Sequence, residues 1–161
     1  MTQYHNIPPV YDKNSRILIL GSFPSVKSRE AQFFYGHPQN RFWKVMSAVL
    51  DCDLPVTVQE KKLMLLSHNI AVWDVIGSCK ITGSSDATIS SVVPNDIAGL
   101  VAETSVTRIF ANGATSYNMY KRYCRDNVGI EAVKLPSTSP ANAAFSLERL
   151  ISEWKSQILS Q

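Results

Sequence analysis

The sequence contains few of the residues that metal and disulfide sites require. Its three cysteines, Cys52, Cys79 and Cys124, lie far apart and form no C-x-x-C pair. This spacing argues against a zinc site, an iron–sulfur cluster or a disulfide framework. The cysteines are expected to be small buried residues of a protein in a reducing compartment.

Long apolar runs and a strong charge bias are also missing. No hydrophobic stretch approaches the length of a membrane span, and residues 1–12 lack the basic start and apolar centre of a signal peptide. These absences predict a cytoplasmic protein without a membrane partner. The net charge of +3 is compatible with a nucleic-acid partner but too small to establish one. The basic residues Lys121, Arg122 and Arg125 are expected to form a solvated helix face.

Two groups of catalytic motifs are absent as well. No histidine stands beside a nucleophilic serine or cysteine in a recognisable pattern, so the sequence does not support acyl transfer. No glycine-rich loop of the Walker or dinucleotide-binding type is present either. The residues left for chemistry are hydroxyls, side-chain amides and aromatic rings.

What the sequence does contain is an alternation of short apolar runs and amphipathic segments. A chain of 161 residues, 45% of them hydrophobic, is long enough for one globular domain, residues 1–161. The apolar runs predict four strands, at residues 17–20, 70–73, 107–111 and 131–135. The amphipathic segments predict helices at residues 41–50 and 57–68, a short one after 94–96, one at 114–126, and a last one that starts at Ser139-Pro140 and buries Leu147, Leu150, Ile151, Trp154 and Ile158.

Strands that alternate with helices predict parallel crossover connections. We therefore expect an α/β protein, a three-layer α/β/α sandwich with a central four-stranded parallel sheet. Thr57 and Glu60 are spaced as a capping box, and His68 is expected near the C-terminus of the same helix. Residues 1–15 are expected to form an extended arm over the domain, and residues 81–91, which are rich in Gly, Ser and Thr, to form a loop.

The segment from Arg16 to Trp43 organises the predicted site. Its buried strand stops at Gly21-Ser22-Phe23-Pro24-Ser25, and the polar stretch that follows carries Phe34-Tyr35 and His37-Pro38-Gln39-Asn40 before the next helix. Buried strands that end in loops of small residues are where α/β proteins place ligand sites. An ordinary strand–loop–helix connection is the alternative, because such short motifs are common.

Polar residues follow the other three predicted strands too. The carboxyl ends of parallel strands lie at one edge of a sheet, which here collects Asp74, Asn112-Gly113 and residues 135–140 beside the Gly21 loop. Such residues suit a planar base and a phosphodiester backbone, because rings stack on bases, amides bind base edges, and serines hold phosphates.

Each of these residue types also has a purely structural interpretation. Tyr35 could belong to the core, and Asn40 could cap the helix that begins at Arg41. The serines could simply form turns.

Several motifs together resemble a known enzyme superfamily. The runs GSFPS, FYGHPQNRFW and LPSTSPAN, with WDV at Trp73-Asp74-Val75 and NG at Asn112-Gly113, occur in the order found in uracil-DNA glycosylases. More narrowly, the chain resembles the hypoxanthine-DNA (deoxyinosine) glycosylase branch over nearly its whole length. The resemblance implies an α/β/α fold and a monofunctional enzyme that removes a deaminated base from DNA without a metal or cofactor.

The resemblance also implies roles for individual residues. Asn40, in the segment H-P-x-N-x-F-W, would be catalytic, and Tyr35 would stack on the base. Residues expected to bind the base are Gly21, Ser22, Phe23, Tyr35, His37 and Asn112. Residues expected to contact DNA are Ser25, Ser137, Thr138, Ser139, Pro140 and Asn142. The expected partner is DNA that contains a deaminated base, bound by a monomer that associates with the nucleoid through that DNA.

Two departures from the superfamily pattern bear on the substrate. Phe23 stands where most members carry Asp or Asn, and Leu135 stands where several branches carry His. These departures favour hypoxanthine over uracil as the base removed. The alternatives are a uracil- or mismatch-specific DNA glycosylase, a non-catalytic nucleic-acid-binding domain, and a hydrolase of free nucleosides.

Overall fold

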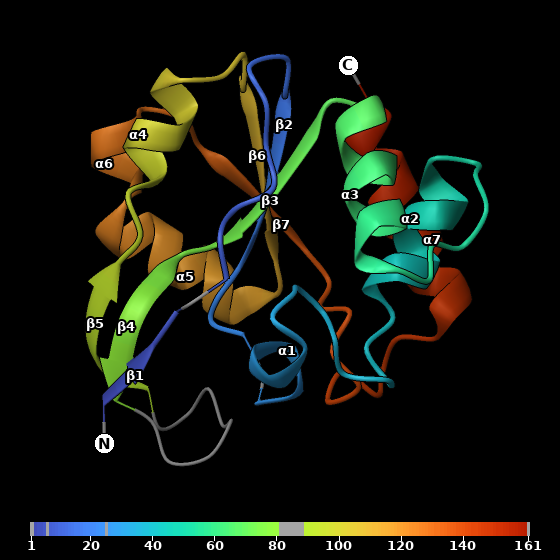
Figure 1. The fold of residues 1–161 in the computed structure, drawn as a ribbon, viewed down its shortest axis with the longest axis horizontal. Helices are drawn as coiled ribbons and strands as arrows, with labels where there is room; N and C mark the ends of the chain where they lie inside the picture. The colour runs from blue at the N-terminus through green and yellow to red at the C-terminus, as the bar shows by residue number, and fades with distance from the viewer. Residues whose placement is uncertain (1, 6, 25, 81–88, 161) are drawn as a thin grey trace.

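The structure, a computed structural model, describes residues 2–5, 7–24, 26–80 and 89–160. Four parallel strands form its central sheet in the order β3-β2-β6-β7 (Figure 1). The strands are β2 (Ile17–Gly21), β3 (Ile70–Asp74), β6 (Arg108–Asn112) and β7 (Ala132–Leu135). Their registers are parallel throughout, which confirms the predicted sheet.

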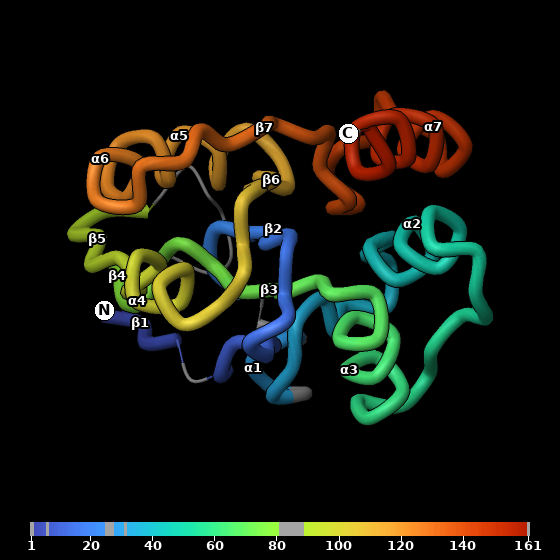
Figure 2. Tube along the Cα trace, turned by 90° about the horizontal axis from the view of Figure 1, so that it is seen from above, coloured from blue at the N-terminus to red at the C-terminus, as the bar shows by residue number. Residues whose placement is uncertain are grey.

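Helices cover both faces of this sheet, as Figure 2 shows. One face carries α2 (Phe42–Val49), α3 (Val58–Ser67) and α7 (Leu147–Ile158). The other carries α4 (Ile97–Ala102), α5 (Ala114–Tyr123) and α6 (Arg125–Val128). Each face has its own cluster of buried apolar side chains, so the three-layer α/β/α sandwich is confirmed.

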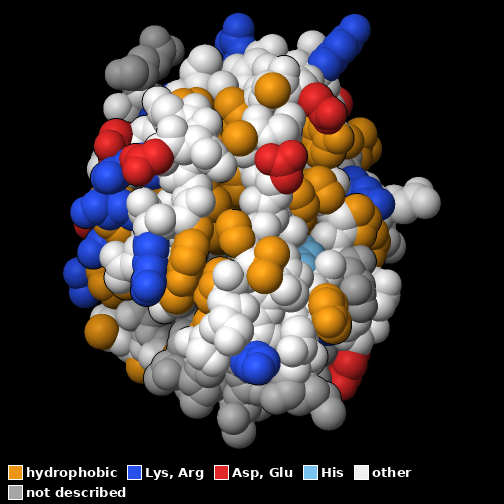
Figure 3. Space-filling model, turned by 90° about the vertical axis from the view of Figure 1, so that its left-hand side faces the viewer, with side chains coloured by type: hydrophobic (Ala, Val, Ile, Leu, Met, Phe, Trp, Pro, Cys, Tyr) orange, Lys and Arg blue, Asp and Glu red, His pale blue; other side chains and the backbone are white. Residues whose placement is uncertain are grey.

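Local signals in the sequence place several helix ends correctly. Thr57 and Glu60 form the predicted capping box of α3, and His68 follows its last turn, where its ring contacts the Met64 carbonyl at 2.7 Å. The apolar face of α7 is also as expected, because Leu150, Trp154 and Ile158 are buried. The cations expected on a solvated face lie on α5 and α6; Lys121 and Arg122 are exposed and Arg125 is half-buried. Figure 3 shows Lys and Arg side chains gathered along one edge of the face that it presents.

A second, antiparallel sheet was not predicted. It consists of β1 (Thr2–Tyr4), β4 (Ile76–Lys80) and β5 (Ser90–Pro94), in the order β1-β4-β5. The loop expected at residues 81–91 is therefore wrong at its end, since Ser90 and Ser91 are in β5; residues 81–88, including Asp86, lie outside the described part.

The N-terminal arm is more than an extended cover. After β1, Ile7 and Val10 are buried, and Val10 forms an antiparallel bridge with Val72 of β3. The arm thus adds a strand to the small sheet and then joins the edge of the central one. The missed signal is weak, because a three-residue strand has too few positions to show alternation.

Three helix expectations need correction. The segment after Ser25 begins with a helix, α1 (Val26–Ala31), where the sequence predicted only a loop. The expected helix 114–126 is two helices, α5 and α6, separated at Cys124. The last helix begins not at Ser139-Pro140 but at Leu147, because Ser146 supplies the cap by accepting from the Arg149 N–H.

One cysteine expectation is also wrong. Cys79 and Cys124 are buried as predicted, whereas Cys52 is exposed. It lies just after α2, between Asp51 and Asp53, in the turn that leads away from the core. The two flanking aspartates were the sequence feature that could have predicted an exposed Cys52.

Candidate active site

The carboxyl ends of the central strands border a cavity of about 750 Å³. Its wall combines the Gly21 loop, the aromatic segment after α1, the start of α5 and the long segment between β7 and α7. Parallel strands bring these four segments together, as the sequence indicated.

Tyr35 forms the aromatic wall of this cavity. Its ring stacks on Phe42 at the start of α2, with centroids 4.0 Å apart and an angle of 16° between the planes. Its backbone has φ = 53°, a left-handed conformation that is unusual for a tyrosine. Packing against Phe42 holds one ring face, so only the opposite face and the edges are available to a ligand.

The Tyr35 hydroxyl is buried and uncharged. Burial raises its pKa well above the ordinary value, the nearby negative charge of Asp74 raises it further, and the Asn112 side chain acts in the opposite direction. No hydrogen bond of standard geometry to this hydroxyl forms among the described residues. Buried polar atoms without partners are uncommon, which marks this position as one that a ligand could complete.

Asn40 is held by a chain of side-chain hydrogen bonds that crosses the cavity wall. Asn112 Nδ2 donates to Thr138 Oγ1 over 3.0 Å, and that hydroxyl donates to Asn40 Oδ1 over 2.8 Å. The Phe42 backbone N–H also donates to Asn40 Oδ1, over 2.9 Å. Both lone pairs of the Asn40 carbonyl oxygen are therefore used, and its NH₂ group is left as a donor.

The Asn40 geometry bears on both of its interpretations. Its contact with the Phe42 N–H satisfies a backbone donor at the start of α2, which is the capping role that the sequence left open. Its position on the cavity wall, beside Tyr35 and the segment after β7, is what a catalytic role requires. The two interpretations are compatible, because they use different atoms of the amide.

The segment between β7 and α7 is a structured loop, which we call the 137–145 loop. Ser137 Oγ accepts from the Ser139 N–H, and Ser139 Oγ accepts from the Ala141 N–H. Asn142 Nδ2 donates to the Ser137 carbonyl. The serine oxygens thus form turns, as one interpretation proposed, while each hydroxyl proton remains available to an outside acceptor.

Arg41 ties the 137–145 loop to α2. Its guanidinium donates to the backbone carbonyls of Ser139, Asn142 and Phe145. In addition, its backbone N–H donates to the Thr138 carbonyl over 3.1 Å. The Ser139 and Asn142 carbonyls also accept turn hydrogen bonds from the Asn142 and Phe145 N–H groups, so Arg41 and these turns together hold the loop before the last helix. The sequence predicted Arg41 at the start of a helix and indicated no role for its side chain.

The start of α5 completes the wall. Gly113 precedes this helix with φ = 96°, and a Cβ there would lie 3.0 Å from Ser137 Cβ, so only glycine fits comfortably. No side chain caps the first turn of α5, whose residues Ala114 and Thr115 line the cavity. The positive end of a ten-residue helix therefore faces the cavity.

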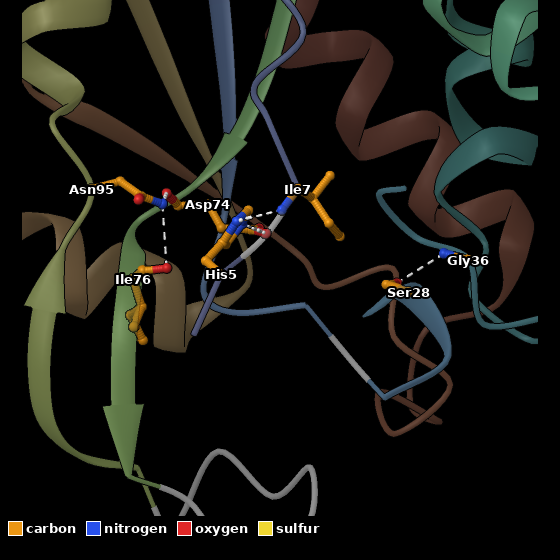
Figure 4. A network of polar contacts seen from close by, with 7 residues as sticks. All are labelled: His5, Ile7, Ser28, Gly36, Asp74, Ile76 and Asn95. Atoms are coloured by element: carbon orange, nitrogen blue, oxygen red, sulfur yellow. Dashed lines mark hydrogen bonds and ion pairs between the residues drawn. The ribbon is translucent and has the colours of Figure 1, made fainter. Parts of the chain in front are cut away.

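A buried hydrogen-bonded pair that the sequence did not reveal stands at the end of β3. His5 of the N-terminal arm and Asp74 lie 2.8 Å apart, between Nε2 and Oδ2, and both side chains are almost fully buried. Figure 4 shows the two side chains turned toward each other. Asp74 also lines the cavity. The position of Asp74 directly after a predicted strand indicated that it lies at the carboxyl edge of the sheet, whereas no sequence pattern indicated a role for His5.

The predicted site residues are largely gathered in one place. The cavity wall includes Asn40 and the expected base-binding residues except His37, that is Gly21, Ser22, Phe23, Tyr35 and Asn112. It also includes Ser137, Thr138, Ser139 and Asn142. His37 and Pro140 do not line it; His37 Nδ1 accepts from the Gln39 N–H within its own turn. Ser25 lies outside the described residues.

Metal-ligating side chains do not form groups of three or more in the part of the chain that the structure describes. None of its helices there is long and apolar enough to cross a membrane.

The fold and the cavity define a class: an α/β/α protein with an amide- and aromatic-lined pocket at the carboxyl edge of a four-stranded parallel sheet. The model of the uracil DNA glycosylase superfamily matches residues 8–159. The chain therefore belongs to the uracil DNA glycosylase superfamily.

Similar proteins agree with this membership. A protein from Methanosarcina acetivorans named hypoxanthine DNA glycosylase is 38% identical over 149 residues, which cover 92% of this chain and 93% of that protein. A protein of the same name from Methanosarcina barkeri is 34% identical over 149 residues, with 91% and 92% covered. A solution NMR structure of a Methanosarcina acetivorans protein described as a uracil DNA glycosylase matches with a TM-score of 0.80 and 36% identity, covering 98% of this chain and 96% of the other.

Proposed function

We propose that this protein is a monofunctional DNA glycosylase that hydrolyses the N-glycosidic bond of deoxyinosine in DNA and releases hypoxanthine. The observation that carries the proposal is that Asn40, Tyr35 and the 137–145 loop border the same cavity. Two relatives, 38% and 34% identical to this chain over 149 aligned residues, are named hypoxanthine DNA glycosylase. We further propose that it acts as a monomer on DNA in the cytoplasm, without metal or cofactor.

A base must leave the DNA stack to reach this cavity. Flipping a nucleotide out of the stack costs a few kcal/mol, and this cost is smallest for a mismatched base such as hypoxanthine. The free face of the Tyr35 ring offers a stacking surface, while Phe42 behind it keeps the ring in place. Phe23, which lines the same cavity, is placed to close over the base.

Bond cleavage leaves a cationic sugar and an anionic base. The electron pair of the C1′–N9 bond departs with the base, and water adds to C1′, its proton passing to the departing base or to solvent. Hypoxanthine is a better leaving group than adenine because its carbonyl and ring nitrogens share the negative charge. The protein therefore needs donors that face the departing base and a positioned water.

Asn40 is the residue proposed for this task. Its oxygen is occupied by the Phe42 N–H and the Thr138 hydroxyl, so the fixed NH₂ group is the free part of the amide. An amide is no base at neutral pH, and this one acts as a donor, to the attacking water or to the base. Thr138 and Asn112 hold it in place, which lowers the reorganisation needed at the transition state.

The first turn of α5 is a second source of positive potential. Its uncapped N–H groups and the helix dipole favour an anion in the cavity, either the departing base or a DNA phosphate. The 137–145 loop offers the hydroxyl protons of Ser137 and Ser139 to phosphate oxygens, as the DNA-contact proposal for this loop requires.

A gel assay tests the proposal directly. A labelled duplex with one deoxyinosine is incubated with the protein and then treated with alkali, which cuts the strand at an abasic site. We expect a cut at the deoxyinosine alone, and less or none at uracil. A protein that binds the duplex without cutting it, or one that hydrolyses only free inosine, would overturn the proposal.

A further inference from the structure

The carboxylate of Asp74 is part of the cavity that the proposed function uses, yet the cleavage chemistry gives it no role. Asp74 ends β3, and its side chain is 5% exposed. Gly21 on the neighbouring strand β2 makes room for it: a Cβ on Gly21 would lie 2.3 Å from Asp74 Oδ1. A buried carboxylate in a cleft is costly unless something uses it.

One of the two carboxylate oxygens is already paired. The Ile7 backbone N–H donates to His5 Nδ1, so the proton of the imidazole is on Nε2 and is donated to Asp74 Oδ2. Asn95, shown with them in Figure 4, donates only to backbone carbonyls, those of Asp74 and Ile76. His5 therefore fixes the orientation of the carboxylate.

The other oxygen, Oδ1, accepts no hydrogen bond from any residue in the described ranges, where only Oδ2 is paired. Asp74 lines the cavity, so Oδ1 is the carboxylate oxygen left for a ligand there. The Tyr35 hydroxyl lies on the same side of Gly21, 3.1 Å from the position of the missing Cβ. An unused, oriented acceptor thus stands next to the ring proposed to stack on the base.

We propose that Asp74 selects the base: its Oδ1 accepts a hydrogen bond from the ring N–H of a lactam, the N1–H of hypoxanthine. This inference rests on the proposed function, since it names the group that recognises the base in the same cavity. Hypoxanthine carries a hydrogen on N1, whereas adenine carries a lone pair there. Adenine would set that lone pair against a carboxylate oxygen, with no donor between them.

The contact sorts bases by one chemical feature. Lactam bases, with a ring N–H next to a carbonyl, can satisfy Asp74, whereas adenine and cytosine cannot. A site built to bind an N–H rejects an analogue without it by a factor of about 10⁴ to 10⁵, because the buried acceptor is left unpaired. Asp74 would not separate hypoxanthine from guanine, which also has an N1–H.

The test compares three substrates under single-turnover conditions: duplexes with one deoxyinosine, one 1-methyldeoxyinosine or one deoxyadenosine. The methyl derivative keeps the leaving group similar but replaces the N1–H. For the wild-type protein we expect cleavage at deoxyinosine to be at least about 10³-fold faster than at 1-methyldeoxyinosine. Similar rates on these two substrates would overturn the inference without any variant.

Two variants then assign the effect to Asp74. In Asp74→Asn, His5 holds the amide oxygen, so the NH₂ group faces the cavity and meets N1–H as donor against donor. We expect cleavage at deoxyinosine to fall at least about 100-fold, and the preference over deoxyadenosine to shrink. Asp74→Ala removes the acceptor and makes room, so its rates on deoxyinosine and 1-methyldeoxyinosine should agree within tenfold. Asp126→Asn, the same change at a carboxylate that is 95% exposed, is the matched control.

The outcomes separate this inference from the proposed function. Wild-type protein that leaves deoxyinosine uncut overturns both. If the wild-type protein cuts deoxyinosine and the folded Asp74 variants still prefer it over 1-methyldeoxyinosine, only the role of Asp74 is overturned. Circular dichroism spectra that match the wild type establish that the variants are folded.

Discussion

Asn40 combines a structural and a proposed chemical role in a single amide, and the two can be separated by substitution. Asn40→Ala removes the acceptor for the Phe42 N–H and the Thr138 hydroxyl together with the NH₂ group. We expect it to lower the rate of deoxyinosine cleavage at least about 100-fold and the free energy of unfolding by about 1–2 kcal/mol. Single-turnover cleavage and urea unfolding measure the two effects.

Asn40→Asp is the control that keeps the structure. An aspartate oxygen can still accept both hydrogen bonds, so the free energy of unfolding should stay within about 0.5 kcal/mol of the wild type. The free atom becomes an acceptor with negative charge, which would repel an anionic base, and cleavage should remain low. Full activity in Asn40→Asp would show that the NH₂ group is not required.

A substitution at Gly21 tests whether cleavage depends on the position of the Asp74 carboxylate in the cavity. A methyl group at this position would collide with Asp74 Oδ1, which His5 prevents from turning freely. We expect Gly21→Ala to reduce deoxyinosine cleavage at least about tenfold and to cost about 1–3 kcal/mol of stability.

The matched control for Gly21 is Gly129→Ala. A Cβ on Gly129 would meet nothing within 4 Å, but its φ of 80° strains any other residue, so this variant should lose about 1 kcal/mol and keep full activity. Equal loss of activity in both variants would mean that stability, rather than the cavity, limits cleavage.

At the scale of elements, Arg41 couples the start of α2 to the 137–145 loop through hydrogen bonds of its side chain. A lysine cannot reach the same set of carbonyls, because it has one nitrogen in place of the guanidinium fork. We expect Arg41→Lys to raise hydrogen exchange in residues 137–145 and to weaken binding of product DNA by about tenfold. Arg122→Lys, on the exposed face of α5, should change neither.

The serines of the same loop provide a finer test of DNA contact. In a Ser137→Ala, Ser139→Ala double variant the turn acceptors and the hydroxyl protons are lost together. Binding of product DNA should weaken, while the dependence of affinity on salt should change little, because these are neutral contacts to phosphate. Affinity equal to that of the wild type would remove the loop from the DNA interface.

The sequence revealed those elements whose signals are local. Continuous apolar runs located all four central strands, and Thr57 with Glu60 located the start of α3. The start of α7 was misplaced, because Ser139-Pro140 has the local form of a helix cap, whereas Ser146 caps the helix and the loop carbonyls before it accept from Arg41. Such contacts join residues about a hundred positions apart and leave no local pattern.

In the site, too, some contacts could be predicted from the sequence and others could not. Parallel strands necessarily bring their carboxyl ends together, so Asn112 and residues 137–142 could be placed beside Asn40 from topology alone. The pairing of His5 with Asp74 could not, because it depends on the path of an N-terminal arm whose strand has three residues. The contact of the arm with Asp74, a residue of the cavity wall, therefore becomes visible only in the folded structure.

The whole molecule should lose stability in alkali, because several acidic groups are buried in both apolar clusters. Burial raises the pKa of the Cys124 thiol from 9.0 to about 11, and it raises those of the Tyr35 and Tyr120 hydroxyls as well. A group with a higher pKa in the folded state favours folding below its unfolded pKa. That contribution is lost as the pH rises through the interval between the two values.

Urea unfolding at pH 8.0, 9.5 and 10.5 measures this loss. The free energy of unfolding should fall across the series, with on the order of 1–2 kcal/mol of the decrease due to Cys124. Cys124→Ala and Tyr35→Phe remove ionisable groups from the two clusters, so each should show a smaller decrease than the wild type, even if its stability at pH 8.0 is lower. Tyr4→Phe, at a side chain that is 64% exposed, should follow the wild-type curve. A decrease of the same size in all three variants would place the alkaline sensitivity elsewhere, in surface charge rather than in the buried thiol and hydroxyls.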